Sequence, residues 1–193
     1  MQRRTKIWIG LGTALLVGGT GAGTVAVARE TPVLEPTVKS GTALPDRPRS
    51  HVAQEPFVVL LGDTIIDTDN GQSITAEMIR VYERYQAPVI LLEEVDPKKV
   101  SRYGIVGGTM LDSDIVEIDQ LIEKPALDQA PSNLAVAGRY ILTPDIFEIL
   151  ESTPVGKGGE LQITDALLRQ ANEGCVIAYR FEGRRFDCGS VSG

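Results

Sequence analysis

The clearest setting for chemistry in the sequence is Asp63, which follows a run of large apolar residues. Residues 57–61 are all large and apolar, and two of them are β-branched, so we predict a strand buried on both faces. A parallel strand of this kind ends at the rim of a sheet, where open α/β folds bind ligands. Gly62 leaves room there for a phosphate or another backbone. The alternative is an ordinary strand followed by an acidic turn.

The single histidine and the two cysteines limit the kinds of catalytic and metal site that the sequence can form. The only histidine, His51, falls in a predicted linker, which argues against catalysis by histidine and against a His-rich metal site. Cys175 and Cys188 fit neither a zinc-binding spacing nor a disulfide framework.

The distribution of charge argues against one class of partner. Residues 1–50 carry seven basic and three acidic side chains, whereas residues 51–193 carry twelve basic and twenty-three acidic ones. A nucleic-acid surface needs a basic footprint, so we expect no nucleic-acid partner. An acidic domain is compatible with a small phosphorylated ligand if metal ions or local cations screen the charge.

The N-terminal 28 residues have the order of an export signal. Three basic residues precede an apolar core at residues 7–17, and a small-x-small site follows at Ala26–Ala28. We predict a signal peptide or membrane anchor over 1–28, and the anchor stays open because residues 7–28 would just span a bilayer and contact the membrane. Gly10–Thr13 is a weak match to a phosphate-binding loop, because we expect no strand before it and no Lys or Arg follows.

The rest of the chain divides into a linker and one folded unit. Residues 29–55 contain four prolines and no hydrophobic period, which predicts a disordered linker. Beyond it strands and helices intermingle without an internal repeat, so the fold class is α/β. Further strands are predicted at 87–95, 103–107, 115–122, 134–142 and 175–181. Helices are predicted to begin at Ser73 or Thr75, at Thr143-Pro144 and at Thr164.

Eight segments, in this order, carry a resemblance to a known family. They are Leu61-Gly62-Asp63, Ser101–Gly104, Glu123-Lys124-Pro125, Ala130–Ala135, Gly138-Arg139-Tyr140, Gly159–Asp165, Phe181-Glu182-Gly183 and Asp187-Cys188-Gly189. Together they resemble the bacterial UTP–glucose-1-phosphate uridylyltransferases, also called UDP-glucose pyrophosphorylases. Gln162, residues 131–135 and Cys188 favour this family over the related thymidylyltransferases. The resemblance implies a partial nucleotide-diphospho-sugar transferase fold over 56–193, a Rossmann-like mixed sheet with flanking helices.

The resemblance also implies a reaction and a metal. An oxygen of glucose 1-phosphate attacks the α-phosphorus of UTP, pyrophosphate leaves and UDP-glucose forms, mainly through positioning and charge neutralisation. Such a reaction calls for a hard divalent cation, Mg²⁺. The family motif makes Asp63 and Asp187 the metal ligands and Asp63, Lys124 and Asp187 the catalytic residues. The alternative for the two aspartates is a turn residue and a cap.

The substrate side follows from the same resemblance. It implies sugar-phosphate contacts from Tyr103, Gly104, Glu123, Lys124, Gly138, Glu160 and Asp165. Five of the seven have a structural alternative: a surface ion pair for Glu123 and Lys124, a bulge for Gly138, packing for Tyr103, and helix capping for Asp165. We expect parallel strands ending in Asp63 and Glu123 to open at one rim, with Asp187 returned to it.

The resemblance lacks the family's N-terminal nucleotide-binding half and its C-terminal end. We therefore predict a nucleotidyltransferase domain with UTP and glucose 1-phosphate as substrates, whose synthesis of UDP-glucose is impaired by truncation. The alternative is a non-catalytic sugar-phosphate-binding or interaction domain. The family implies a cytoplasmic homo-oligomer, in conflict with the predicted export signal.

Overall fold

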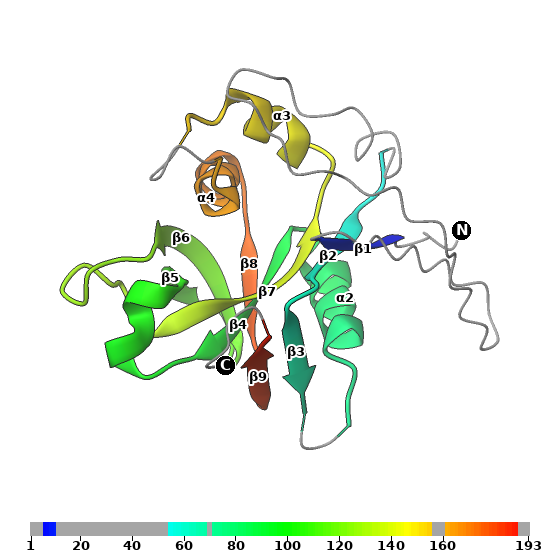
Figure 1. The fold of residues 1–193 in the computed structure, drawn as a ribbon. Helices are drawn as coiled ribbons and strands as arrows, with labels where there is room; N and C mark the ends of the chain where they lie inside the picture. The colour runs from blue at the N-terminus through cyan, green and yellow to red at the C-terminus, as the bar shows by residue number, and fades with distance from the viewer. Residues whose placement is uncertain (1–5, 11–53, 69–70, 156–160, 189–193) are drawn as a thin grey trace.

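The computed structural model describes residues 6–10, 54–68, 71–155 and 161–188, and shows a mixed sheet flanked by helices (Figure 1). Seven strands pair in the order β1-β2-β7-β4-β8-β6-β5. Their bounds are β1 Lys6–Gly10, β2 Phe57–Leu61, β4 Val89–Glu94, β5 Gly104–Met110, β6 Ile115–Glu123, β7 Leu134–Leu142 and β8 Ile177–Arg180. The pairs β1–β2 and β4–β8 are parallel, and the other pairs are antiparallel.

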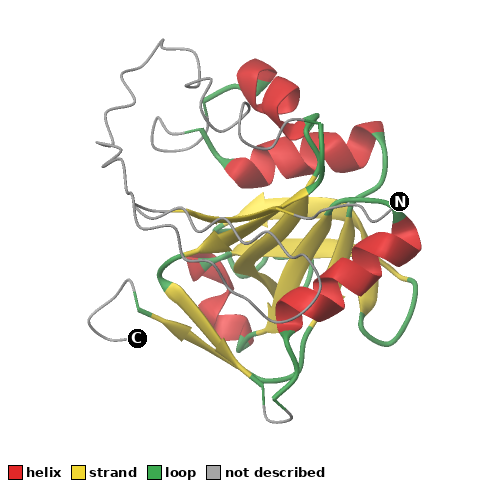
Figure 2. Cartoon of the chain, turned by 90° about the vertical axis from the view of Figure 1, so that its right-hand side faces the viewer, coloured by secondary structure: helices red, strands yellow, loops and turns green. Residues whose placement is uncertain are grey.

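Helices cover both faces of this sheet. Helix α2 (Ile74–Tyr85) packs on one face, and α3 (Ile146–Ser152) and α4 (Ile163–Glu173) pack on the other (Figure 2). Neighbouring residues of β2 point to opposite faces, so Phe57 joins the core under α3 and α4 while Val58 joins the core under α2. Both side chains are buried, which explains the continuous apolar run in the sequence.

Two further pairings complete the arrangement of the strands. The start of β5 pairs with the start of β7, Ile105 opposite Ala135, and this closes β7, β4, β8, β6 and β5 into a ring of paired strands. Separately, β3 (Thr64–Asp67) and β9 (Arg184–Asp187) form a two-stranded antiparallel sheet. A short 3₁₀ helix, η1 (Pro97–Arg102), leads into β5.

The predicted class, an α/β mixed sheet with flanking helices, is confirmed. The start of α2 is also as predicted, because the Ser73 side chain accepts a hydrogen bond from the Ala76 N–H. Two other predicted helix starts are wrong. Asp145 rather than Thr143 is the N-cap of α3, and Gln162 rather than Thr164 is that of α4; neither makes a side-chain capping bond.

Within the predicted signal or anchor range, Lys6–Gly10 forms β1, so the expectation that no strand precedes Gly10 is wrong. Residues 11–28 lie outside the described residues, as do 29–53 of the predicted linker. No helix in the described part of the chain is long and apolar enough to cross a bilayer. The signal, the anchor and the linker therefore stay predictions.

Candidate active site

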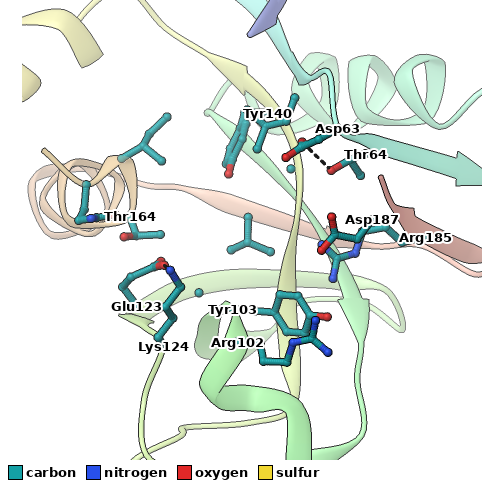
Figure 3. A pocket seen from close by; sticks show the side chains of 16 residues that line it. Asp63, Thr64, Arg102, Tyr103, Glu123, Lys124, Tyr140, Thr164, Arg185 and Asp187 are labelled. Atoms are coloured by element: carbon teal, nitrogen blue, oxygen red, sulfur yellow. Dashed lines mark hydrogen bonds and ion pairs between the residues drawn. The ribbon is translucent and has the colours of Figure 1, made fainter. Parts of the chain in front are cut away.

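A cavity of about 350 Å³ lies where the end of β2, the β3–β9 sheet, β7 and the start of α4 meet. Seven of the nine residues predicted as site residues line it: Asp63, Tyr103, Gly104, Glu123, Lys124, Gly138 and Asp187. Figure 3 shows the side chains around this pocket. Of the other two, Asp165 lies in the first turn of α4 but does not line the pocket, and Glu160 lies outside the described residues.

Asp63 and Asp187 come together through backbone pairing. Asp63 directly precedes β3, whose first residue, Thr64, is the register partner of Asp187 on β9. The Cys188 N–H also donates to the Asp63 carbonyl at 2.7 Å. Both carboxylates line the pocket, and the Thr64 hydroxyl donates to Asp63 Oδ1 at 3.4 Å. In Figure 3 these three residues lie on one side of the pocket.

Two carboxylates make only part of a metal site. In the part of the chain that the structure describes, no three His, Cys, Asp or Glu side chains gather closely enough to hold an ion. Mg²⁺, however, usually binds through one or two carboxylates and fills its remaining positions with water and substrate phosphate oxygens. The hard oxygen donors of Asp63 and Asp187 therefore fit such an ion together with a phosphorylated ligand.

Glu123 and Lys124 reach the pocket by a route that differs from the predicted one. We expected the strands ending in Asp63 and Glu123 to be parallel, and this is wrong, because β6 runs antiparallel to β2 through the intervening pairings. Glu123 instead arrives opposite Gly104 at the start of β5, and the Lys124 N–H donates to the Tyr103 carbonyl at 2.9 Å. The pairing of β5 with β7 then brings this corner to the pocket.

The backbone of Lys124 is in the left-handed region, with φ of 46°. A non-glycine residue rarely takes this conformation, and such residues cluster at functional sites. Its Nζ lies 3.7 Å from Glu123 Oε1, and the side chain is largely exposed, so this ion pair by itself stabilises little. Lys124 can therefore leave Glu123 and pair with a ligand anion at a small cost in free energy.

β7 supplies the floor of the pocket through Val136, Gly138 and Tyr140, which share one face of the strand. Gly138 has φ of +70° and sits where the register against β4 is irregular, which is the bulge weighed as its structural alternative. Burial raises the pKa of Tyr140 far above its ordinary value, and the negative charges of Glu123 and Asp63 add to the effect. Its phenol therefore stays protonated and can donate a hydrogen bond.

Sequence reasoning missed a second set of pocket residues: Thr64, Arg102, Tyr140, Thr164 and Arg185. Arg185 lies two residues from Asp187 on β9 and so shares its face of the strand, but sequence reasoning had no signal for it because β9 itself was not predicted. Phe186, between them, points the other way and is exposed. Thr164 is buried, and its hydroxyl has no hydrogen-bond partner among the described residues.

An α/β fold with carboxylates and cations around one pocket is an arrangement that can accommodate a phosphorylated ligand and a divalent cation. The model of the nucleotidyl transferase family matches residues 25–193. The chain therefore belongs to the nucleotidyl transferase family, whose members generally use a divalent metal ion.

Similar proteins point to one branch of this family. The UTP–glucose-1-phosphate uridylyltransferase of Pseudomonas aeruginosa strain PAO1 is 47% identical over 145 residues, 75% of this chain and 52% of that protein. UTP–glucose-1-phosphate uridylyltransferase 2 of Staphylococcus saprophyticus is 43% identical over 75% of this chain and 50% of its own length. The resemblance predicted from the sequence motifs is thus confirmed. The chain spans about half the length of the curated relatives it matches.

Solved structures agree with this assignment. A UDP-glucose pyrophosphorylase complexed with UDP-glucose superposes with a TM-score of 0.72 at 47% identity, over 75% of this chain and 55% of that one. The UTP-bound UGPase from Acinetobacter baumannii gives a TM-score of 0.67 at 38% identity, over 75% and 50%. A Bacillus anthracis thymidylyltransferase, at 24% identity and a TM-score of 0.59, shares the fold.

Proposed function

We propose that this chain contributes the sugar-phosphate and metal side of a UTP–glucose-1-phosphate uridylyltransferase, which forms UDP-glucose and pyrophosphate from UTP and glucose 1-phosphate. The observation that carries this proposal is the pocket itself, which is lined by Asp63, by Asp187 and by the adjacent residues Glu123 and Lys124, from three separate stretches of the chain. The names of the similar proteins support the choice of substrates.

The metal in this proposal is Mg²⁺, held by Asp63 and Asp187 on one wall of the pocket. When bound, it would neutralise charge on the phosphate oxygens. The Thr64 hydroxyl, which donates to Asp63, would orient that carboxylate. Asp187 is held in place because it pairs with Thr64 in the two-stranded β3–β9 sheet.

The sugar phosphate lies, in this proposal, between the Glu123–Lys124 corner and the floor of β7. The Glu123 carboxylate accepts hydrogen bonds from sugar hydroxyls, and the Lys124 ammonium pairs with the phosphate as a point charge. Gly104 and Gly138 let the ring approach the backbone, because a Cβ at either position would meet a pocket side chain within about 3.1 Å. The protonated phenol of Tyr140 serves as a hydrogen-bond donor.

Calorimetric titration of the 193-residue chain with glucose 1-phosphate, with and without Mg²⁺, tests this proposal. We expect saturable binding that strengthens with Mg²⁺, and Mn²⁺ binding detected by electron paramagnetic resonance. Asp63→Asn should abolish the metal dependence, because it removes one of two anionic ligands. Asp119→Asn, an exposed carboxylate on β6 outside the pocket, is the matched control and should change neither. A chain that binds no glucose 1-phosphate, or an Asp63→Asn variant that keeps the Mg²⁺ effect, would contradict the proposal.

A further inference from the structure

The side chain of Arg185 is largely buried at the wall of the pocket. It lies on the same face of β9 as Asp187, and its Nε forms an ion pair with Oε1 of Glu93 on β4. The side chains are only 10% and 17% exposed, respectively. This pair therefore ties the small β3–β9 sheet to the main sheet beside the pocket.

A second contact fixes the plane of the guanidinium. The Arg185 Cζ lies 4.5 Å from the centre of the Tyr103 ring, within the range of a cation–π interaction. Glu93 thus lies against Nε of the guanidinium as an ion-pair partner, and the Tyr103 ring lies against its face. Among the described residues, the ion pair of Arg185 is made through Nε and not through Nη1 or Nη2. Figure 3 shows Arg185 and Tyr103 together at the wall of the pocket.

The protein contains a similar group of side chains that offers a comparison. Arg84 lies 3.4 Å from Asp112 and 5.0 Å from the centre of the Tyr85 ring. Its side chain is 64% exposed and that of Asp112 is 50% exposed, and neither lines the pocket. A pair as deeply buried as Glu93 and Arg185 loses much hydration, so it is a poor way to gain stability alone. Its location indicates a role in binding instead.

We propose that Arg185 is an anion-binding residue of the pocket, that Glu93 and Tyr103 are its positioning residues, and that the anion is a phosphate group of the ligand. A guanidinium held in this way presents two N–H groups in the fork that matches phosphate oxygens. Arg185 would act together with Lys124, whose exposed ammonium supplies a point charge from the other side of the pocket. The identity of the ligand as a sugar phosphate rests on the proposed function above.

The test is calorimetric titration of the 193-residue chain with three probes: glucose 1-phosphate, inorganic phosphate and glucose. Arg185→Gln should weaken both phosphate-containing probes at least about tenfold, or about 1.4 kcal/mol, and leave glucose unchanged. Arg185→Lys should recover part of the loss, because it restores the charge without the fork. Arg84→Gln is the matched control and should leave all three probes unchanged.

Positioning by Glu93 has its own readout. Glu93→Gln should weaken phosphate binding in the wild-type background and have no further effect once Arg185 is Gln, because the two side chains act as one unit. Equal effects of Glu93→Gln in both backgrounds would overturn the positioning role. Thermal melts of each variant verify folding, and Arg185→Lys, which keeps a cation beside Glu93, carries the test if Arg185→Gln does not fold.

The outcomes separate this inference from the proposed function. If the wild type binds glucose 1-phosphate and Arg185→Gln binds it equally well, the inference is overturned and the proposed function stands. If the wild type does not bind glucose 1-phosphate, the proposed function fails, and inorganic phosphate decides the role of Arg185. Phosphate binding that is lost in Arg185→Gln then supports the anion site, whereas absent or unchanged phosphate binding overturns it.

Discussion

Replacing Gly138 with alanine tests whether the left-handed backbone of β7 is what allows Thr64 to approach the floor of the pocket. Gly71→Ala is a matched control, because the φ angles are +70° and +67° and nothing lies within 4 Å of a Cβ built at Gly71. An alanine in this region is destabilised by about 1–2 kcal/mol. At Gly138 the Cβ would also lie 3.1 Å from Thr64 Oγ1 and 3.2 Å from Leu61 Cδ1. Crowding of this kind adds about 1–3 kcal/mol.

We therefore expect Gly71→Ala to lower the free energy of unfolding by about 1–2 kcal/mol and Gly138→Ala to lower it by about 2–5 kcal/mol. Any gain from a less flexible unfolded chain is common to both variants and cancels in the comparison. Urea denaturation measures the two free energies, and glucose 1-phosphate titration should show weaker binding for Gly138→Ala alone, because Thr64 and Leu61 line the pocket. Equal destabilisation, or unchanged binding by Gly138→Ala, would refute the reasoning.

Three further predictions use other features of the structure. Lys124→Gly should raise the free energy of unfolding by up to about 1 kcal/mol, because φ of Lys124 is 46° and glycine adopts this conformation without strain. The same variant should weaken glucose 1-phosphate binding at least about tenfold. Gln86→Gly, at φ of 52°, is the control and should change stability by the same amount while leaving binding unchanged. Burial raises the pKa of Glu93 and Arg185 opposes this, so the folded state holds that proton more tightly than the unfolded state. The stability that Glu93 contributes is therefore fully present below its ordinary pKa of 4.5 and is lost as pH rises through the raised value, and the loss should be steeper in Arg185→Gln. Urea midpoints of the wild type and of Arg185→Gln from about pH 4 to pH 8 measure this. A difference in stability between the two proteins that does not change with pH would contradict it. Met78→Ala, at a site with no exposure between α2 and the sheet, should lower the unfolding free energy by about 2–5 kcal/mol, and a loss below about 1 kcal/mol would show that the core collapses around it.

The elements found from sequence are those with strong local signals. The strand predicted at 134–142 has the bounds of β7, because an apolar run between turn residues fixes both ends. By contrast, β3 and β9 were not predicted. Each has four residues with no apolar run, and each is a strand only because the other pairs with it across more than a hundred residues of sequence. Local patterns contain no information about such a partner.

In the candidate site, too, some features could be predicted from local sequence and others depend on how distant segments pair. Asp63 could be singled out because it follows a strand with a recognisable pattern, and Glu123 because it belongs to a family motif at the end of a predicted strand; the structure brings both to one pocket. How Glu123 gets there could not be predicted, since the direction of β6 depends on the order of all the strands between it and β2. Thr164 was misassigned for a similar reason: threonine is a common cap, but packing at the start of α4 buries this one.

Residues 6–10 can either pair with β2 in the sheet or belong to an export signal or membrane anchor, and one excludes the other. Register pairs from Lys6 opposite Phe57 to Gly10 opposite Leu61 make β1 the parallel neighbour of β2 at one edge of the main sheet. A segment that is cleaved after export, or that lies in a bilayer, cannot pair with β2 in the same molecule. If β1 is paired in the purified chain, deleting residues 1–10 should speed amide exchange at the β2 N–H groups that face it and spare those bonded to β7. If exchange at β2 is the same in both chains, β1 contributes nothing to the sheet in solution, and the residues are free to serve as the predicted export signal or anchor.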